Sequence, residues 1–204
     1  PQGRPAVDGG RVVFGAWDCH LYCIDTETGT MLWRWNNGSG NRLFSPGHIV
    51  PRISHGRVMI VAPDRHMTFM DLATGRQLWR IKSRKVRETT GISDDGEMFY
   101  AKTMDGEMIA VPVDADTYTE AWTADAGWGY DHNPCPILTR DGVAYMANRT
   151  GMIAAVDESD GRLLGAAKIA SAAANDFTAD DNGGIWVSFI DGRIFRIGLK
   201  TAGR

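Results

Sequence analysis

The chain has 204 residues and a formal net charge of −3, so it can bury a sizeable core but lacks the basic surface of a nucleic-acid-binding protein. No apolar run approaches the roughly 20 residues needed to cross a bilayer, and 24 glycines favour a protein with many tight turns. We therefore expect an all-β protein with no membrane span and no nucleic-acid partner.

The first 36 residues read as four short strands separated by turns. An apolar segment at 5–7 precedes β-rich runs at 12–17, 21–25 and 31–35. Similar inner segments recur at 48–50, 90–92, 136–138 and 177–179, each followed by further β-rich runs. Four antiparallel strands in every 40–45 residues are typical of a β-propeller blade.

A sequence motif repeats with the same period. Residues 23–33 reappear as 69–79 with the same Asp, Thr, Gly and Trp; a longer copy ends at Trp122, and a fourth copy, 155–165, has Gly165 in the Trp position. We expect the Asp to accept backbone N–H groups in a turn, the Gly to supply a positive φ, and the Trp to pack between blades. The residues assigned to this structural motif are Asp25, Gly29, Trp33, Asp71, Gly75, Trp79 and Trp122.

The recurring β-rich runs and the repeated motif together predict one propeller domain over 1–204, with blades at about 1–36, 44–83, 87–124, 132–170 and 174–200. The fifth blade stops without an outer strand, so we expect the C-terminal part of a larger propeller. Residues 162–174 are rich in alanine, which favours a helix, but the repeat register predicts an outer strand at 163–169.

The first and fifth blades lack covalent neighbours, so the faces meant to pack between blades would be uncovered there. Uncovered edges and apolar patches promote association. We expect either self-association through these terminal blades or a compact ring of five blades.

The motif A-x-D-x-x-T-G-x-x-x-W resembles that of the pyrroloquinoline-quinone-like repeat family, and the resemblance covers essentially the whole chain. That family includes quinoprotein alcohol dehydrogenases, a periplasmic lipoprotein of the outer-membrane β-barrel assembly machinery, and repeat domains attached to other modules. Segments 44–46, 61–65 and 86–89 look most like bacterial propellers fused to an N-terminal calcineurin-like metallophosphoesterase. The resemblance implies a bacterial, periplasmic or extracellular protein, although the first residues contain no signal peptide.

The dehydrogenases of this family hold the quinone between a tryptophan and a disulfide of adjacent cysteines, with a calcium ion. Here Cys19, Cys23 and Cys135 are not adjacent. We therefore expect no quinone, no calcium and no other metal, and a buried free thiol at Cys23.

The strand order places the outer-to-inner connections and the second-to-third-strand turns on one rim of the propeller. The ligand- or partner-binding candidates on this rim are His48, Arg65, Arg87, Glu88, Trp128, Tyr130, Asp131, His132 and Asn175. Their histidine and acidic side chains can form a metal site or an acid/base pair if the blades converge, or can be solvated residues.

No catalytic sequence signature is present. We therefore predict a non-catalytic binding or scaffolding module for a protein partner, a polymer or an upstream domain of the same polypeptide. The alternatives are a fragment of a quinone-dependent dehydrogenase and a hydrolase that uses the rim side chains.

Overall fold

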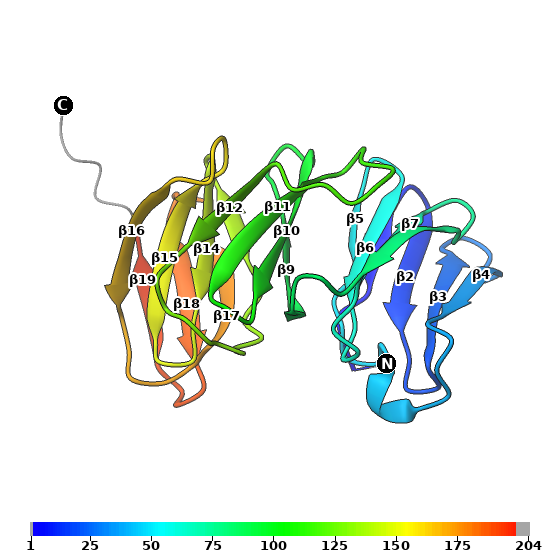
Figure 1. Ribbon diagram of the computed structural model, residues 1–204, viewed down its shortest axis with the longest axis horizontal. Coiled ribbons are helices and arrows are strands. Elements are labelled where there is room, and N and C mark those ends of the chain that lie inside the picture. The colour runs from blue at the N-terminus through cyan, green and yellow to red at the C-terminus, as the bar shows by residue number, and fades with distance from the viewer. Residues whose placement is uncertain (1, 199–204) are drawn as a thin grey trace.

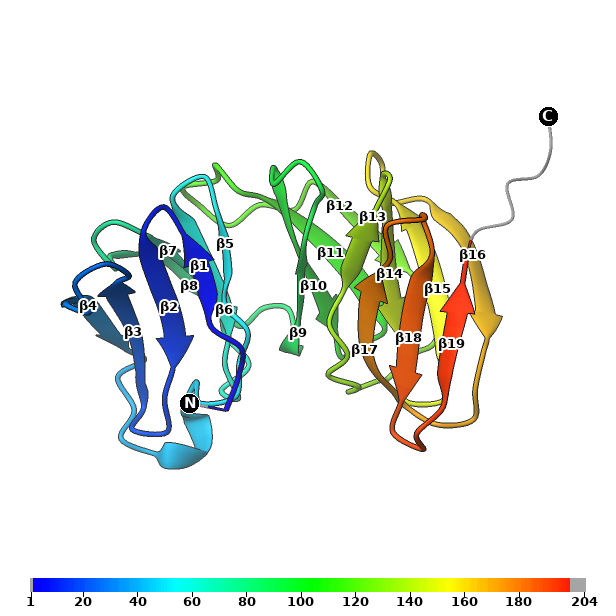
Figure 2. The ribbon, with the colours of Figure 1, turned by 180° about the vertical axis from the view of Figure 1, so that it is seen from behind.

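The computed structural model describes residues 2–198 as five antiparallel β-sheets set side by side in an arc (Figure 1 and Figure 2). The described helical structure is a single 3-10 turn, η1 (Arg42–Phe44). The all-β propeller fold expected from the repeat is therefore confirmed. The first and fifth sheets stand at opposite ends of the arc (Figure 2), so the five blades form an open arc and not the compact ring considered above.

Within residues 2–198, the first four blades have four strands each and the fifth has three. The first blade contains β1 (Ala6–Asp8), β2 (Arg11–Gly15), β3 (His20–Asp25) and β4 (Met31–Asn36). The second contains β5 (Arg52–Ser54), β6 (Arg57–Val61), β7 (Met67–Asp71) and β8 (Gln77–Ile81). The third contains β9 (Val86–Ile92), β10 (Met98–Thr103), β11 (Glu107–Pro112) and β12 (Trp122–Asp125). The fourth contains β13 (Leu138–Arg140), β14 (Val143–Ala147), β15 (Met152–Asp157) and β16 (Leu163–Lys168), and the fifth contains β17 (Ala174–Ala179), β18 (Ile185–Phe189) and β19 (Ile194–Ile197).

Within each blade the strands pair in chain order, and the first strands of successive blades are neighbours along the inside of the arc. Two of these inner strands begin later than the sequence predicts. β5 starts at Arg52 and not at residue 48, and β13 starts at Leu138 and not at residue 136. Pro51 and Pro136 have no backbone N–H, so neither can donate to a strand ladder, and pairing begins after each of them.

The hydrophobic core is divided into four clusters, one between each pair of neighbouring blades. Side chains of a strand alternate between its two faces, and β6 shows the consequence. Val58 and Ile60 pack toward the first blade, whereas Met59 and Val61 pack toward the third. A middle blade therefore contributes to two cores, and neighbouring blades share each core.

The repeated turn has the hydrogen bonds expected of an Asx-type turn. The Asp25 carboxylate accepts from the backbone N–H and the hydroxyl of Thr28 at 2.8 and 2.9 Å. Asp71 accepts from the same two groups of Thr74 at 2.8 and 2.7 Å. Gly29 and Gly75 have φ values of +69° and +70°, the left-handed region that glycine adopts without steric cost.

Each motif tryptophan crosses to the next blade. The indole Nε1–H of Trp33 donates to the carbonyl oxygen of Leu72 at 2.8 Å, that of Trp79 to Ala115 at 3.1 Å, and that of Trp122 to Glu158 at 3.0 Å. A Cβ atom on Gly75 would lie 2.5 Å from the Trp33 ring, and one on Gly161 would lie 2.7 Å from the Trp122 ring. The motif glycines of the second and fourth blades therefore also make room for the indole of the preceding blade.

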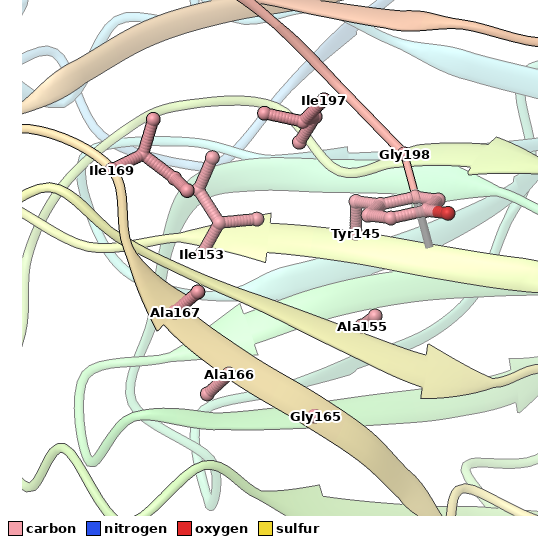
Figure 3. A pocket seen from close by; sticks show the side chains of 9 residues that line it. All are labelled: Tyr145, Ile153, Ala155, Gly165, Ala166, Ala167, Ile169, Ile197 and Gly198. Carbon is pink, nitrogen blue, oxygen red and sulfur yellow. The ribbon is translucent and has the colours of Figure 1, made fainter. Parts of the chain in front are cut away.

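The fourth blade keeps the strand but lacks the tryptophan. β16 forms where the repeat register places a strand, although its alanines favour a helix. Gly165 pairs with Ala155 as Trp33 pairs with Cys23 and Trp79 with Phe69. Beside Gly165 is a hollow of about 250 Å³, lined by Tyr145, Ile153, Ala155, Gly165, Ala166, Ala167, Ile169, Ile197 and Gly198 (Figure 3).

Candidate functional site

One rim of the arc, which we call the connection rim, brings together two kinds of loop. The chain segments that join one blade to the next are 37–51, 82–85, 126–137 and 169–173, and the turns between second and third strands are 16–19, 62–66, 104–106, 148–151 and 190–193. Backbone hydrogen bonds tie the two kinds of loop together, for example from Met104 to the Lys85 carbonyl at 2.6 Å and from Asp131 to the Met104 carbonyl at 2.9 Å. The rim is therefore a continuous, internally braced surface.

Three of the candidate residues meet at one place on this rim. His48 Nε2 lies 3.2 Å from one Glu88 carboxylate oxygen, and Arg87 Nε lies 3.2 Å from the other. The Trp17 ring stacks on His48 with 5.4 Å between ring centroids. His48 comes from the connection after the first blade, and Arg87 and Glu88 come from the first residues of β9. The structure thus joins residues that are 40 positions apart in the sequence.

The Glu88 carboxylate is held as an anion. Burial tends to raise its pKa, but the hydrogen bond with His48, a backbone hydrogen bond and the charge of Arg87 together lower the pKa below its ordinary value. A general acid that works near neutral pH needs a raised pKa. The arrangement is therefore suited to holding the His48 ring in place beneath Trp17 and not to delivering a proton from Glu88.

Asp131 lies under the rim and not on it. Its side chain is only 3% exposed and pairs with the Lys102 ammonium group, which also donates to the Ala147 carbonyl oxygen at 2.8 Å. The other Asp131 oxygen accepts the backbone N–H of Arg149 at 2.9 Å. Burial tends to raise the Asp131 pKa, but Lys102 and the backbone donors outweigh it and the pKa is lowered. The Asp131 carboxylate therefore joins its own connection, 126–137, to β10 and to the turn 148–151, and both of its oxygens are engaged, one by Lys102 and the other by the Arg149 backbone.

Trp128 and Tyr130 border a second part of the rim. They line a hollow of about 330 Å³ together with Asp131, Asn148, Arg149, Thr150 and Met152. The Trp128 Nε1–H has no hydrogen-bond partner among the described residues. Tyr130 is 60% exposed, and its ring lies 5.9 Å from that of His132. The Trp128 donor is itself buried, so the exposed Tyr130 ring and the polar side chains of the hollow are what this part of the rim offers to a contact.

The remaining two candidates lie apart from these groups. Arg65 borders a third hollow, of about 400 Å³, lined by Asn37, Ser39, Phe44, Pro63, Asp64, Arg65, His66, Arg80 and Lys82. Asn175 is exposed near the start of β17. The nine candidates are therefore spread over several separate places on the rim.

Several polar residues that belong to no sequence motif are buried or paired in the structure. Lys102 is the first, and its signal is a single charged residue in the apolar run of β10. Arg52 on β5 donates to the carbonyl oxygen of Thr90 at 2.6 Å, and burial lowers its pKa to about 10. Arg4, before β1, forms an ion pair with Asp176 of β17 and so connects the first blade to the fifth.

Two further findings concern cofactors and membranes. Within residues 2–198, no three His, Cys, Asp or Glu side chains converge to hold a metal ion. The three cysteines are separate, buried free thiols. In the same part of the chain, no helix has both the length and the apolar character needed to cross a membrane.

Comparison with known proteins relates this arc to one protein family and to several solved structures. The sequence profile of a family described as outer membrane protein assembly factor BamB matches residues 1–103. No curated protein sequence matches the chain. BamB from Moraxella catarrhalis superimposes with a TM-score of 0.71 at 19% identity, over 96% of this chain and 57% of that one. The chain therefore spans a little over half the length of that BamB.

Two computationally designed proteins are also similar in structure. Ika8 gives a TM-score of 0.65 at 18% identity, over 97% of this chain and 70% of its own. Ika4 gives 0.61 at 16% identity, over 74% of this chain and 89% of its own. At these identities the structures show a shared propeller fold. Because the family profile covers half of the sequence, the chain belongs to the family of the outer membrane protein assembly factor BamB, built from quinoprotein-like β-propeller repeats.

Proposed function

We propose that this chain is a non-catalytic binding module that holds a partner protein on its connection rim. The proposal rests on the uneven distribution of exposed large hydrophobic side chains between the two rims. Five of them lie in the rim loops: Trp17, Leu43, Phe44, Tyr130 and Ile190. The loops of the opposite rim contain no exposed large hydrophobic side chain within the described residues.

The composition of the connection rim supports a protein partner. Aromatic residues and arginine are enriched where protein interfaces are buried. The rim presents Trp17 at 45% exposure and Tyr130 at 60%, and elsewhere on the same rim Arg87 is partly exposed and Arg65 is exposed. The two rim carboxylates that could take part in acid–base catalysis already have partners. Glu88 is an anion between His48 and Arg87, and Asp131 is buried against Lys102.

Membership of the family supports an extracytoplasmic, bacterial partner. The family description names an outer membrane protein assembly factor. We propose that the partner of this chain is likewise a protein of the bacterial cell envelope, or a domain of the same polypeptide. No quinone or metal is part of this proposal.

The terminal blades offer a second contact surface. On the fifth blade, Trp186 is 39% exposed and Ile194 is 65% exposed, and both lie on the sheet that ends the described row of blades. We propose that this face packs against another blade or a second copy of the chain. Light scattering over a range of concentrations, on the wild type and on the Ile194→Asp variant, tests this. Association that is weakened by the variant is expected, and a monomer at every concentration would contradict it.

The rim proposal is tested in two steps. A photo-crosslinking amino acid is placed at Leu43 on the connection rim or at Glu27 on the opposite rim, and crosslinked proteins are identified in the cell envelope of the native organism. The identified partner is then purified and its affinity measured with Leu43→Asp and Tyr130→Asp variants. The control is Leu32→Asp, which also replaces an exposed leucine, 43% exposed against 77% for Leu43, but on β4.

The expected result is a partner crosslinked from position 43 and not from 27. Its Kd should rise at least about tenfold in the rim variants, which corresponds to about 1.4 kcal/mol, and change less than about twofold in the control. Equal crosslinking from both rims, or a loss of affinity in the control alone, would overturn the proposal.

A further inference from the structure

The hollow beside Arg65, which we call the Arg65 pocket, has an excess of positive charge. Its lining contains the cationic side chains of Arg65, Arg80 and Lys82 and a single carboxylate, that of Asp64. Asp64 is already in use, because it accepts from Arg80 Nη2 at 2.5 Å and from Asn37 at 2.7 Å. Arg65 and Lys82 form no ion pair with any described residue. Two positive charges of the pocket therefore have no counter-charge within the described chain.

The backbone at Arg65 is strained. Its φ is +63°, the left-handed region that residues with a Cβ avoid. The same place in the turns of the last three blades is occupied by Gly106, Gly151 and Gly192, all with positive φ. The repeat thus uses glycine at this place in three blades, and the second blade departs from it.

The first blade departs as well, with Cys19 at this place, but there the side chain is used by the fold. Cys19 is buried and its sulfur lies 3.3 Å from the Ser45 hydroxyl. Arg65 is exposed, and its guanidinium makes no hydrogen bond to another described residue. Strain of this kind persists at functional positions, where the side chain contributes something other than stability.

Arg80 supplies a further unused donor. Its side chain is mostly buried and its Nη2 binds Asp64, but its Nε–H has no partner among the described residues. A buried donor without a partner costs free energy that a ligand oxygen can recover. Phe44 and Pro63 provide an apolar wall of the same hollow, so the pocket combines cationic donors with a non-polar surface.

We propose that the Arg65 pocket binds a carboxylate group, with Arg65 and Lys82 as its charged donors. Planar guanidinium groups pair with carboxylates through two parallel hydrogen bonds. The carboxylate belongs either to a small organic acid or to an acidic side chain of a protein. The inference rests on the proposed function, because the Arg65 pocket lies on the connection rim that is proposed to hold the partner.

The experiment uses the full chain and three probes: succinate, a peptide of four glutamates with blocked termini, and inorganic phosphate. Binding is measured by isothermal titration calorimetry. The key variant is Arg65→Gly, because glycine relieves the backbone strain and the melting temperature is expected to stay level or rise. Arg76→Ala is the control, since Arg76 is an exposed arginine in a turn of the opposite rim.

At least one carboxylate probe should bind the wild type and the Arg76→Ala variant. Loss of a charge-assisted contact should weaken binding about 10- to 100-fold in Arg65→Gly, with a smaller loss in Lys82→Gln. Binding of succinate assigns the site to small acids, and binding of the peptide alone assigns it to an acidic protein segment. Failure of both probes, unchanged affinity in Arg65→Gly, or equal binding of phosphate would overturn the proposal.

The two proposals fail separately. If a partner protein needs Leu43 and Tyr130 but not Arg65, the rim function stands and the pocket inference is wrong. If succinate binds in an Arg65-dependent way but no partner crosslinks from the rim, the pocket inference stands without the rim function.

Discussion

The indole ring of Trp79 stacks on the phenyl ring of Phe69 with 4.2 Å between centroids, while its N–H reaches the Ala115 carbonyl of the next blade. One side chain thus joins an aromatic pair within its own blade to a polar contact across the blade interface. Trp79 is only 8% exposed. Its contribution should therefore be that of a core aromatic.

Replacing Trp79 by alanine should lower the free energy of unfolding by about 3–5 kcal/mol, the range for large aromatic deletions in cores. Trp17→Ala is the control, because Trp17 is 45% exposed and its loss should cost less than about 1 kcal/mol. Urea denaturation followed by circular dichroism measures both. Similar costs for the two variants would show that Trp79 does not act as a core residue.

A comparison of Gly29 with Gly75 distinguishes two reasons for a motif glycine, the left-handed backbone and the space occupied by a tryptophan ring. Gly29 and Gly75 have nearly the same φ, but a Cβ at Gly29 would meet nothing within 4 Å, whereas one at Gly75 would lie 2.5 Å from the Trp33 ring. Gly29→Ala should cost about 1–2 kcal/mol from the left-handed backbone alone. Gly75→Ala should cost about 1–3 kcal/mol more, from overpacking.

The same denaturation experiment compares the two alanine variants directly. In a Trp33→Ala background the extra cost at position 75 should disappear, because the ring that clashes has been removed. An extra cost that persists without the ring would assign it to some other contact.

Features that depend on residues close together in the sequence can be predicted from it, whereas contacts between residues far apart in the sequence cannot. The Asp71 turn and Gly75 are set by neighbours within a few residues, so the repeated letters predict them. The Lys102–Asp131 pair joins residues 29 positions apart. The strand pattern predicts an accessible Asp131 on the rim, because nothing in the sequence shows that the Lys102 side chain of β10 reaches this carboxylate and that both are buried. The Arg65 pocket draws its wall from residues 37–82, and only the fold brings these together.

The buried Lys102–Asp131 pair makes the free energy of unfolding depend on pH. The Asp131 pKa is lowered, so the folded chain binds this proton less readily than the unfolded chain does. The stabilisation is complete above the pKa of an unfolded aspartate, about 3.9, and is lost as the pH falls through the lower pKa of the folded state.

A double variant, Lys102→Met with Asp131→Asn, tests this contribution. Urea midpoints are measured between pH 7 and pH 2.5, and the drop below about pH 4 should be smaller in the double variant than in the wild type. Asp131→Asn alone should cost about 3–5 kcal/mol at pH 7, because it leaves the Lys102 ammonium group buried without its counter-charge. Parallel pH profiles for wild type and double variant would contradict the assignment.

The hollow beside Gly165 offers a gain of stability. Gly165 occupies the place of the motif tryptophans, and a Cβ there would meet nothing within 4 Å. Gly165→Trp should raise the free energy of unfolding by about 0.5–2 kcal/mol, the usual range for filling a cavity. Gly165→Asp places a charge at the same site and should give no gain, and a Trp variant that melts below the wild type would show that the hollow does not accept an indole.

Titration with the quinone and calcium tests whether this chain binds the cofactor as quinoprotein dehydrogenases do. Addition of the quinone with calcium should leave the intrinsic tryptophan fluorescence unchanged after correction for absorbance by the quinone, because the three cysteines are buried single thiols. A quinoprotein dehydrogenase treated in the same way is the positive control. Saturable quenching of this chain would contradict the expectation.

The sharing of each core between two blades has a consequence for how the chain comes apart. Since a blade buries its apolar faces only against its neighbours, the row behaves as a one-dimensional series of coupled units. A central blade shares a core with two neighbours and a terminal blade with one, and the described link between the two end blades is the partly exposed Arg4–Asp176 ion pair. Fraying should therefore start at the two ends and move inward. Amide hydrogens of β10 and β11 should then be the last to exchange with solvent, and any upstream or downstream neighbour would slow exchange most in the blade that it touches.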